Sequence, residues 1–226
     1  MSELENAPIR AATEVAEFIR ENLELLPVPA FPDIVLYTPH PASGLRRLES
    51  AVDEDGDPYP PYWAYVWGGG AVLVRHIRAN PGLVQGRRVV DLGSGSGIVG
   101  IAAAQAGAAS VLAAEVDRNG LAAIALNAAA NGVDLASTGE DLIAGDPPDA
   151  DLMLVGDLFY APDLASRVLP FLTRCAAAGI EVVVGDPFRA HLPLGALLPI
   201  AEYSVADFGD SPHSADTRSA VFQLRA

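Results

Sequence analysis

The sequence predicts an α/β fold in which helices cover both faces of a doubly wound, mostly parallel sheet. Apolar segments of strand length at 87–92, 110–115, 150–156 and 180–185 alternate with Ala-rich helical segments at 98–107, 118–130 and 162–177. This alternation is typical of parallel β-α-β units. Beyond Pro187, segments 200–208 and 219–226 are expected to close the sheet as an antiparallel edge. A chain of 226 residues, 50% of them hydrophobic, suits one such domain with some additions.

The N-terminal part is expected to form a small extension, residues 1–57, ahead of a main domain at 58–226. Residues 10–26 carry an apolar stripe at helical spacing, and Pro27 and Pro29 are expected to stop this helix. Segment 33–39 has the pattern of a short strand, and segment 49–61 is acidic and rich in Pro, which is typical of a solvated loop.

The composition excludes several classes of function. A net charge of −15 disfavours a nucleic-acid partner and favours a basic or lysine-bearing one; all 14 basic residues are Arg. Cys175 is the single cysteine, so no internal disulfide forms, and the four His lack zinc-site spacing, so no metal is expected. The N-terminus is acidic and has no long apolar run, so we expect no signal peptide, no membrane contact and no membrane span. We expect a cytoplasmic location.

The stretch VVDLGSGSGIVG at 89–100 leads from a strand through alternating glycines into a helix. Gly93, Gly95 and Gly97 let backbone N–H groups approach a nucleoside, because no Cβ intervenes. Glu115 follows Gly95 by 20 residues, at the end of the next strand, where a carboxylate accepts ribose hydroxyls. The spacing fits both a nicotinamide dinucleotide and S-adenosylmethionine, so it does not decide between them.

Two further features favour S-adenosylmethionine. Asp91 stands at the mouth of the first strand, where its charge would repel a pyrophosphate and attract an ammonium or a sulfonium. After the strand at 150–156 the chain reads Asp157-Leu158-Phe159-Tyr160, and a nicotinamide enzyme has no particular need for D-x-x-Y.

From about residue 58 onward, the segments PYWAYVWGGGAVLVRHI, VVDLGSGSGIVGIAAAQAGA, VLAAEVD, GDLFY and VVVGDPFR occur in this order. In this order they resemble the seven-strand S-adenosylmethionine methyltransferases, and most of all the lysine methyltransferases of the electron transfer flavoprotein β subunit. The chain departs from that family at Gly68, usually Pro, at Glu115, usually Asp, and at Phe188, usually Gly.

The resemblance implies a Rossmann-like sheet, S-adenosylmethionine as cofactor and a lysine of the electron transfer flavoprotein β subunit as target. A ribosomal protein is the alternative target. From other classes, an NAD-dependent oxidoreductase and a non-catalytic cofactor-binding adaptor remain open. The resemblance also implies that Trp67 contacts the cofactor and that Asp141 and the backbone N–H of Leu142 contact its adenine.

Several side chains near the carboxyl ends of the strands are candidates for substrate contact. Asp157 is expected to bind and orient the lysine amine while Tyr160 donates a hydrogen bond; the alternative for Asp157 is a cap on the helix starting near Pro162. Trp63, one of an aromatic cluster that includes Tyr62, Tyr65 and Trp67, is expected to face a methylated ammonium or else to pack in the core. Asp186 and Arg189 are expected to orient the substrate or to form an Asp-Pro turn. Asp117 is expected either near the ribose or as a helix cap.

Overall fold

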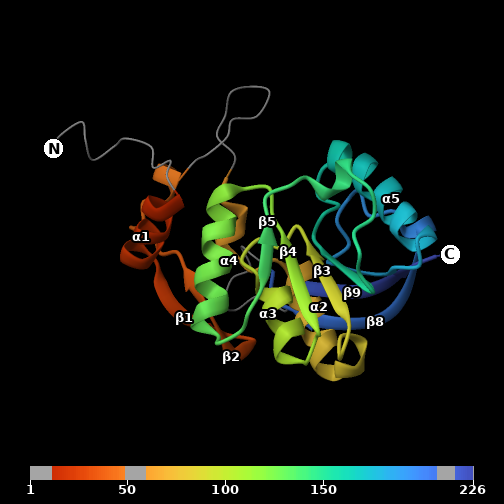
Figure 1. Ribbon diagram of the computed structural model, residues 1–226, viewed down its shortest axis with the longest axis horizontal. Coiled ribbons are helices and arrows are strands. Elements are labelled where there is room, and N and C mark those ends of the chain that lie inside the picture. Colours follow the sequence, from red (N-terminus) through yellow and green to blue (C-terminus); the bar gives the residue numbers. More distant parts are fainter. Residues whose placement is uncertain (1–11, 49–59, 208–216, 226) are drawn as a thin grey trace.

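A computed structural model describes residues 12–48, 60–207 and 217–225 (Figure 1). The acidic loop expected at 49–61 lies outside the described residues except for its last two positions, and so does the predicted boundary at residue 57. Within the described ranges, none of the helices combines the length and apolar character needed to cross a bilayer.

The sheet confirms the predicted fold class. Its seven strands lie in the order β5-β4-β3-β6-β7-β9-β8, of which the first five are parallel and the last two pairings antiparallel. The strands are β3 (Arg88–Leu92), β4 (Ser110–Ala114), β5 (Ala136–Thr138), β6 (Leu152–Gly156), β7 (Glu181–Asp186), β8 (Leu197–Val205) and β9 (Thr217–Leu224). Because β8 runs antiparallel to β9, its carboxyl end lies at the same edge of the sheet as those of the parallel strands.

Helices cover both faces of this sheet because successive strand side chains point to opposite sides. Val89 packs into one core with α2 (Gly68–Ala79) and α3 (Ile98–Gln105). Its neighbour Val90 packs into the other core with α5 (Pro162–Ala177). The remaining helix of the main domain, α4 (Arg118–Ala130), follows β4. Ile124 of α4 packs against the turn that precedes α3, where a Cβ on Gly97 would lie 3.4 Å from its Cγ1.

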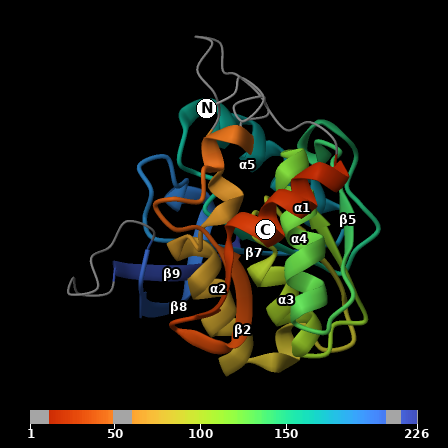
Figure 2. The ribbon, with the colours of Figure 1, turned by 90° about the vertical axis from the view of Figure 1, so that its left-hand side faces the viewer.

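The N-terminal segment packs onto the main domain. Helix α1 (Ala12–Asn22) lies against α4 and buries its predicted apolar stripe there, and β1 (Glu24–Val28) pairs with β2 (Phe31–Thr38) (Figure 2). The predicted helix over 10–26 is therefore too long, because the chain turns into a strand at Glu24. Pro27 is tolerated there since β1 is an edge strand.

The other edge of β2 is hydrogen-bonded to two asparagine side chains, one in α4 and one directly after it. Asn131 accepts a hydrogen bond from the Val35 N–H and donates one to the Val35 carbonyl, and Asn127 accepts from the Tyr37 N–H. The hairpin is thereby fixed to the helix that follows the second strand of the main sheet. Short 3-10 turns complete the described structure at Leu45–Leu48, Tyr62–Ala64, Pro81–Leu83, Leu142–Ala144 and Leu194–Ala196.

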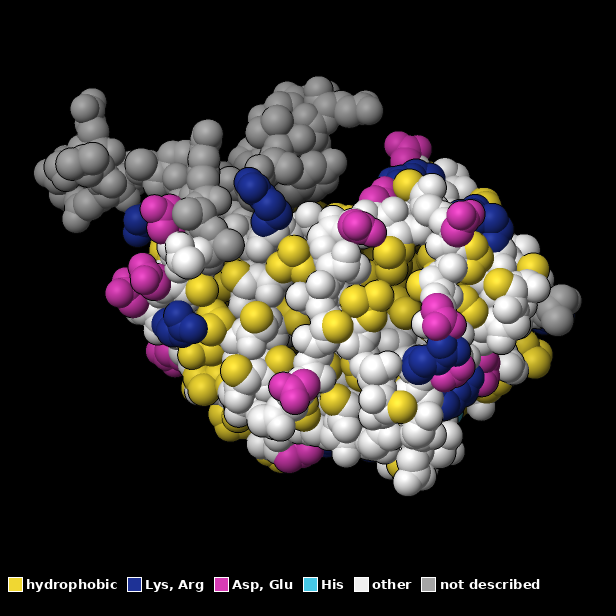
Figure 3. Space-filling view, in the orientation of Figure 1, with side chains coloured by type: hydrophobic (Ala, Val, Ile, Leu, Met, Phe, Trp, Pro, Cys, Tyr) yellow, Lys and Arg dark blue, Asp and Glu magenta, His cyan; other side chains and the backbone are white. Residues whose placement is uncertain are grey.

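Charged side chains are mixed on the face shown in Figure 3. Among the residues coloured there, Arg side chains lie singly or in small groups beside Asp and Glu side chains, and form no continuous basic patch on this face.

Candidate active site

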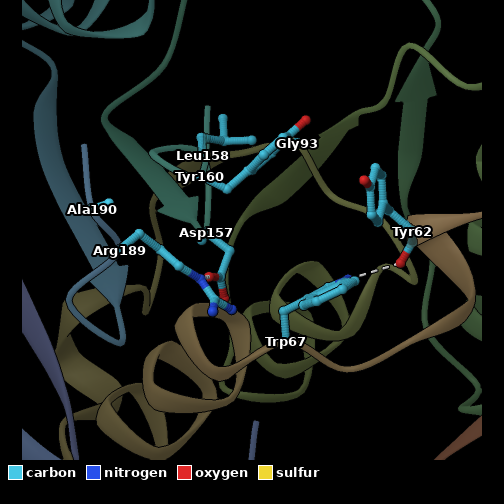
Figure 4. A pocket seen from close by; sticks show the side chains of 9 residues that line it. Tyr62, Trp67, Gly93, Asp157, Leu158, Tyr160, Arg189 and Ala190 are labelled. Carbon is cyan, nitrogen blue, oxygen red and sulfur yellow. Dashed lines mark hydrogen bonds and ion pairs between the residues drawn. The ribbon is translucent and has the colours of Figure 1, made fainter. Parts of the chain in front are cut away.

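Two adjoining pockets lie at the carboxyl edge of the sheet. We call the first, of about 450 Å³, the aromatic pocket; it is lined by Tyr62, Trp67, Gly93, Asp157, Leu158, Tyr160 and Arg189, with Gly156 and Ala190 (Figure 4). We call the second, of about 200 Å³, the acidic pocket; its polar lining includes Glu115, Glu140, Asp141 and Arg167. Gly93, Leu158 and Tyr160 line both pockets, which therefore form one elongated site.

The glycine turn after β3 forms the floor between the pockets. Gly93, Gly95 and Gly97 all have positive φ, which L side chains rarely adopt. At Gly93 an added Cβ would also lie 2.5 Å from Leu158 Cδ2, so a substitution would displace that side chain as well as strain the backbone. The backbone thus reaches the site directly at Gly93, as the sequence predicted for this turn.

Asp91 does not lie where the sequence placed it. Its carboxylate is buried, lines neither pocket, and accepts hydrogen bonds from Ser94 Oγ (2.6 Å) and the Gly100 N–H (3.0 Å). The alternation along β3 explains this, because Asp91 points to the same face as Val89, toward α3. Burial raises the pKa of Asp91 to about 6. Asp91 therefore stabilises the glycine turn and the start of α3 through its hydrogen bonds to Ser94 and Gly100.

Glu115 lies in the acidic pocket beside the same turn. One oxygen accepts the Gly95 N–H and the other the Asp117 N–H, both at 2.9 Å. Burial raises the pKa of Glu115. Asp117 itself caps α4 by accepting the Asn119 N–H at 2.8 Å, so the capping alternative is confirmed for this residue.

Asp141 and Leu142 line the far end of the acidic pocket. The Asp141 carboxylate accepts the Ile143 N–H at 3.2 Å and forms an ion pair with Arg167 of α5. Asp141 thus begins the turn Leu142–Ala144, and this turn shapes the pocket wall.

The aromatic cluster divides between pocket and core. Tyr62 and Trp67 line the aromatic pocket; their ring centroids are 5.6 Å apart, and the Trp67 indole donates to the Tyr62 carbonyl at 2.9 Å. The Tyr160 ring lies 5.9 Å from that of Tyr62. Trp63 is only 2% exposed and packs with α1 and α4, so its predicted substrate contact is wrong. In the 3-10 turn at Tyr62–Ala64, neighbouring side chains leave in different directions, and Trp63 takes the inward one.

Asp157 is at the inner end of the aromatic pocket, directly after β6. Its backbone adopts φ +56°, and its N–H donates to the Gly185 carbonyl at 3.2 Å. One carboxylate oxygen accepts the Gly69 N–H at the start of α2, and the other accepts Arg189 Nε at 2.7 Å. Burial raises the pKa of Asp157, and this effect outweighs the opposing one of Arg189. Asp157 does not cap α5, whose N-cap is Ala161 and has no side-chain cap.

The close approach of α2 to β7 fixes this carboxylate in place. A Cβ on Gly69 would lie 2.3 Å from the Gly185 carbonyl oxygen and 2.6 Å from the Asp157 N, so only glycine fits at this position. The N–H that Asp157 accepts is therefore held by backbone-to-backbone packing.

Asp186 and Arg189 have different places at the end of β7. Arg189 lines the aromatic pocket, but Asp186 lines neither pocket and is fully buried, so a direct substrate contact by Asp186 is wrong. Asp186 Oδ1 accepts the Arg189 N–H at 2.6 Å and so forms the turn that presents Arg189. Burial raises the pKa of Asp186 to about 7. Phe188, within this turn, has φ +64°, a conformation that glycine adopts more readily than phenylalanine.

The sequence reasoning missed Asp207. Its carboxylate contacts Arg189 Nη2 (2.8 Å) and accepts the Gly68 N–H at 2.7 Å. Asp207 comes two residues after β8, and the antiparallel pairing expected for the last strands already places the end of β8 at the edge that carries the site. This topological signal could have found it. Among the described residues, no group of three His, Cys, Asp or Glu side chains is arranged to hold a metal ion.

Comparison with known proteins identifies the family. The family model of ribosomal protein L11 methyltransferase (PrmA) matches residues 79–152. The electron transfer flavoprotein beta subunit lysine methyltransferase of Xenopus laevis is 35% identical over 220 residues, covering 95% of this chain and 88% of its own. That of Homo sapiens is 32% identical over 218 residues, covering 92% and 81%. The chain belongs to the family of electron transfer flavoprotein beta subunit lysine methyltransferases.

A solved structure shares the fold of this chain. A Pyrococcus horikoshii protein described as a candidate RNA methyltransferase superposes with a TM-score of 0.53 at 15% identity, covering 74% of this chain and 91% of its own. The predicted resemblance and enzyme class, a lysine methyltransferase, are confirmed by membership of the family. The assignments of several residues to cofactor or substrate stay predictions, which their positions around the two pockets favour: Trp67, Gly93, Glu115, Asp141, Leu142, Asp157, Tyr160 and Arg189. Gly95 and Gly97 line neither pocket, and their assignment to the cofactor also stays a prediction.

Proposed function

We propose that this protein uses S-adenosylmethionine to methylate a lysine side chain of the electron transfer flavoprotein β subunit. Family membership supports the substrate, because the relatives that match most of the chain carry this activity in their names. The acidic charge of the chain, −15, favours a partner that presents a lysine.

The elongated site fits S-adenosylmethionine. Its floor carries no side chain at Gly93, and the Glu115 oxygens, held by two backbone N–H groups, keep lone pairs for ribose hydroxyls. Asp141 and Leu142 would hold the purine in the acidic pocket, and Trp67 with the glycine turn would hold the methionyl part. When bound, this cofactor supplies an electrophilic methyl group on a sulfonium.

The chain's own task is to prepare the amine. A lysine ammonium has no lone pair, and removing its proton at pH 7 costs roughly 4.6 kcal/mol from an ordinary pKa of ~10.4. The buried Asp157 carboxylate attracts the lysine ammonium and orients its nitrogen within a pocket walled by aromatic rings. The proton passes to solvent before methyl transfer, and the neutral amine then presents its lone pair to the methyl group. The position of Asp157 in this pocket is the observation that carries the proposal.

The proposal is tested with the purified protein, labelled S-adenosylmethionine and purified electron transfer flavoprotein β subunit, with ribosomal protein L11 in parallel. We expect label on the flavoprotein subunit, located to a lysine by mass spectrometry, and thermal stabilisation by S-adenosylhomocysteine without stabilisation by NAD(H). Label on L11 alone would favour the ribosomal alternative. Stabilisation by NAD(H) alone would favour an oxidoreductase. Binding of S-adenosylhomocysteine without methyl transfer to any protein would favour an adaptor.

A further inference from the structure

Arg189 bridges two carboxylates at the inner end of the aromatic pocket. Its Nε donates to Asp157 at 2.7 Å and its Nη2 contacts Asp207 at 2.8 Å. The two carboxylate side chains are 9% and 11% exposed, so this is a largely buried ion-pair network. Figure 4 shows the Arg189 side chain reaching from the turn after β7 to a position beside Asp157 and near Trp67.

The surroundings of this guanidinium are those of a binding site for a cation. The Arg189 Cζ lies 5.9 Å from the centroid of the Trp67 ring, and Tyr62 and Tyr160 line the same pocket. A carboxylate on one side and an aromatic face on the other attract a cation and shield it from water. A substrate ammonium entering the pocket meets these same groups.

Asp157 is already engaged on both oxygens. Gly69 N–H donates to one and Arg189 to the other, so an incoming ammonium reaches the oxygen that faces the pocket beside a guanidinium of the same charge, which already takes one lone pair of that oxygen. Asp157, Asp207 and the adjacent buried Asp186 surround this one guanidinium, so the described carboxylates outnumber it. A lysine ammonium would add a second cation to this cluster.

We propose that Arg189 occupies the place beside Asp157 that the substrate lysine takes, and that Asp207 keeps the guanidinium when the lysine enters. This inference rests on the proposed function. Arginine suits the role because its guanidinium stays charged and so does not act as a nucleophile. Since the chain contains no Lys, the protein has no side-chain amine of its own to methylate.

The backbone around Arg189 permits this exchange without rearrangement. Asp186 accepts the Arg189 N–H at 2.6 Å, so the backbone of the turn is held while the Arg189 side chain changes its partner. Asp207 is held independently by the Gly68 N–H at 2.7 Å and already contacts Nη2. The receiving carboxylate is thus in position before the substrate arrives.

The first test is Arg189→Lys. A lysine Nζ falls where the arginine Cζ lies, one bond beyond Nε, and so within reach of Asp157. With S-adenosylmethionine alone, we expect this variant to methylate itself at residue 189, seen as added methyl mass in the intact protein and located by peptide mass spectrometry. The matched control is Arg88→Lys, because Arg88 also bridges two carboxylates, Asp149 and Asp151, but at the opposite edge of the sheet. Wild type and the control should gain no mass.

The second test is Arg189→Met, which removes the competing cation and keeps an unbranched stem. We expect n-butylammonium, a mimic of the lysine side chain, to bind this variant about tenfold tighter than wild type at pH 8 by calorimetry, because the vacated site has lost its internal occupant. S-adenosylhomocysteine binding confirms that each variant is folded.

An unmethylated Arg189→Lys, or an Arg189→Met that binds n-butylammonium no tighter than wild type, overturns the inference. Neither result bears on the proposed function, which is read from wild-type methylation of the flavoprotein subunit in the same series. If wild type modifies no protein while Arg189→Lys modifies itself, the substrate proposal fails and the placement of Arg189 stands.

Discussion

Two arginines each bridge a pair of aspartates, at opposite edges of the same sheet. At the amino edge, Arg88 contacts Asp149 at 2.5 Å and Asp151 at 2.7 Å, with its side chain 43% exposed. At the carboxyl edge, Arg189 contacts Asp157 and Asp207 at 2.7 and 2.8 Å, with carboxylates about one-tenth exposed. The contact distances of the two networks are similar, but the pKa values of Asp151 and Asp157 are shifted in opposite directions.

The pKa values show the difference. Hydrogen bonds from Arg88 lower the pKa of Asp151 to about 2, whereas burial raises the pKa of Asp157 in spite of Arg189. Desolvation thus outweighs pairing at the carboxyl edge, and pairing dominates at the amino edge. The exposed network is satisfied as it stands, while the buried one gains from a further cation. The comparison teaches that burial, and not the ion pair itself, sets the direction of the pKa shift, and the proposed amine site is at the network where burial dominates.

Removing one carboxylate from each network should give the largest contrast. Asp157→Asn is expected to lower kcat/KM for methyl transfer by about 100-fold or more, since it leaves Arg189 without one partner and the amine without its carboxylate. Asp151→Asn is expected to keep transfer within about twofold, because exposed ion pairs contribute little. Steady-state kinetics measure both, and cofactor affinity, by calorimetry, should stay near wild type in each. A collapse of cofactor binding in Asp157→Asn would mean that this residue holds the cofactor.

Glu115 sharpens the comparison, because it is a half-buried carboxylate with backbone partners in place of an arginine. Glu115→Gln is expected to weaken S-adenosylhomocysteine binding by about tenfold or more, through loss of charged hydrogen bonds to the ribose. The matched variant is Glu181→Gln at the amino edge, where Glu181 pairs with Arg87 at 2.7 Å. It should bind the cofactor as wild type does. Unchanged affinity in Glu115→Gln would place the ribose elsewhere.

The smallest expected effect is a pair of opposite pH dependences of stability. The folded pKa of Asp186, about 7, lies above its ordinary 3.8, so the stability from this group is full below about pH 4 and is lost as pH rises through 7. Asp186→Asn imitates the protonated form and should gain a few degrees in Tm over wild type at pH 8, with no gain at pH 4.

Asp151 should show the reverse. Its folded pKa, about 2, lies below 3.8, so its stability is present above about pH 4 and is lost as pH falls through 2. Asp151→Asn should therefore have a slightly lower Tm than wild type at pH 7, and the difference should vanish near pH 2. Thermal unfolding across this range measures both variants, and slopes of the same sign would contradict the contrast between the two edges.

The sequence predicted the sheet well because its signals are local. Strand and helix periodicity located β3, β4, β6 to β9 and α3 to α5 within a few residues, but gave no range for α2 or for the short β5. In the N-terminal extension the predicted helix over 10–26 was too long, because Leu25 and Leu26 continue the apolar pattern into an edge strand. Spacing also predicted Glu115 and the glycine turn, since both depend on one strand and the turn that follows it.

Side-chain direction was beyond such reasoning. Asp91 and Trp63 stand at the expected positions in the chain, but alternation along β3 and the path of the turn at Tyr62–Ala64 point them inward. Asp207 lies 50 residues beyond Asp157 and belongs to no motif, so only the direction of β8 brings it to the site. Pairing across distant segments depends on packing, which the sequence pattern does not specify.

The backbone contact between Gly69 and Gly185 has a consequence for descent within the family. Each position excludes even a methyl group, since an added Cβ would lie 2.3 Å from the carbonyl oxygen of the other residue. A relative with a side chain at either position would need a different entry to α2 and, with it, another support for the Asp157 carboxylate, to which Gly69 donates its N–H. A glycine at both positions is therefore what we expect in sequences that share this site.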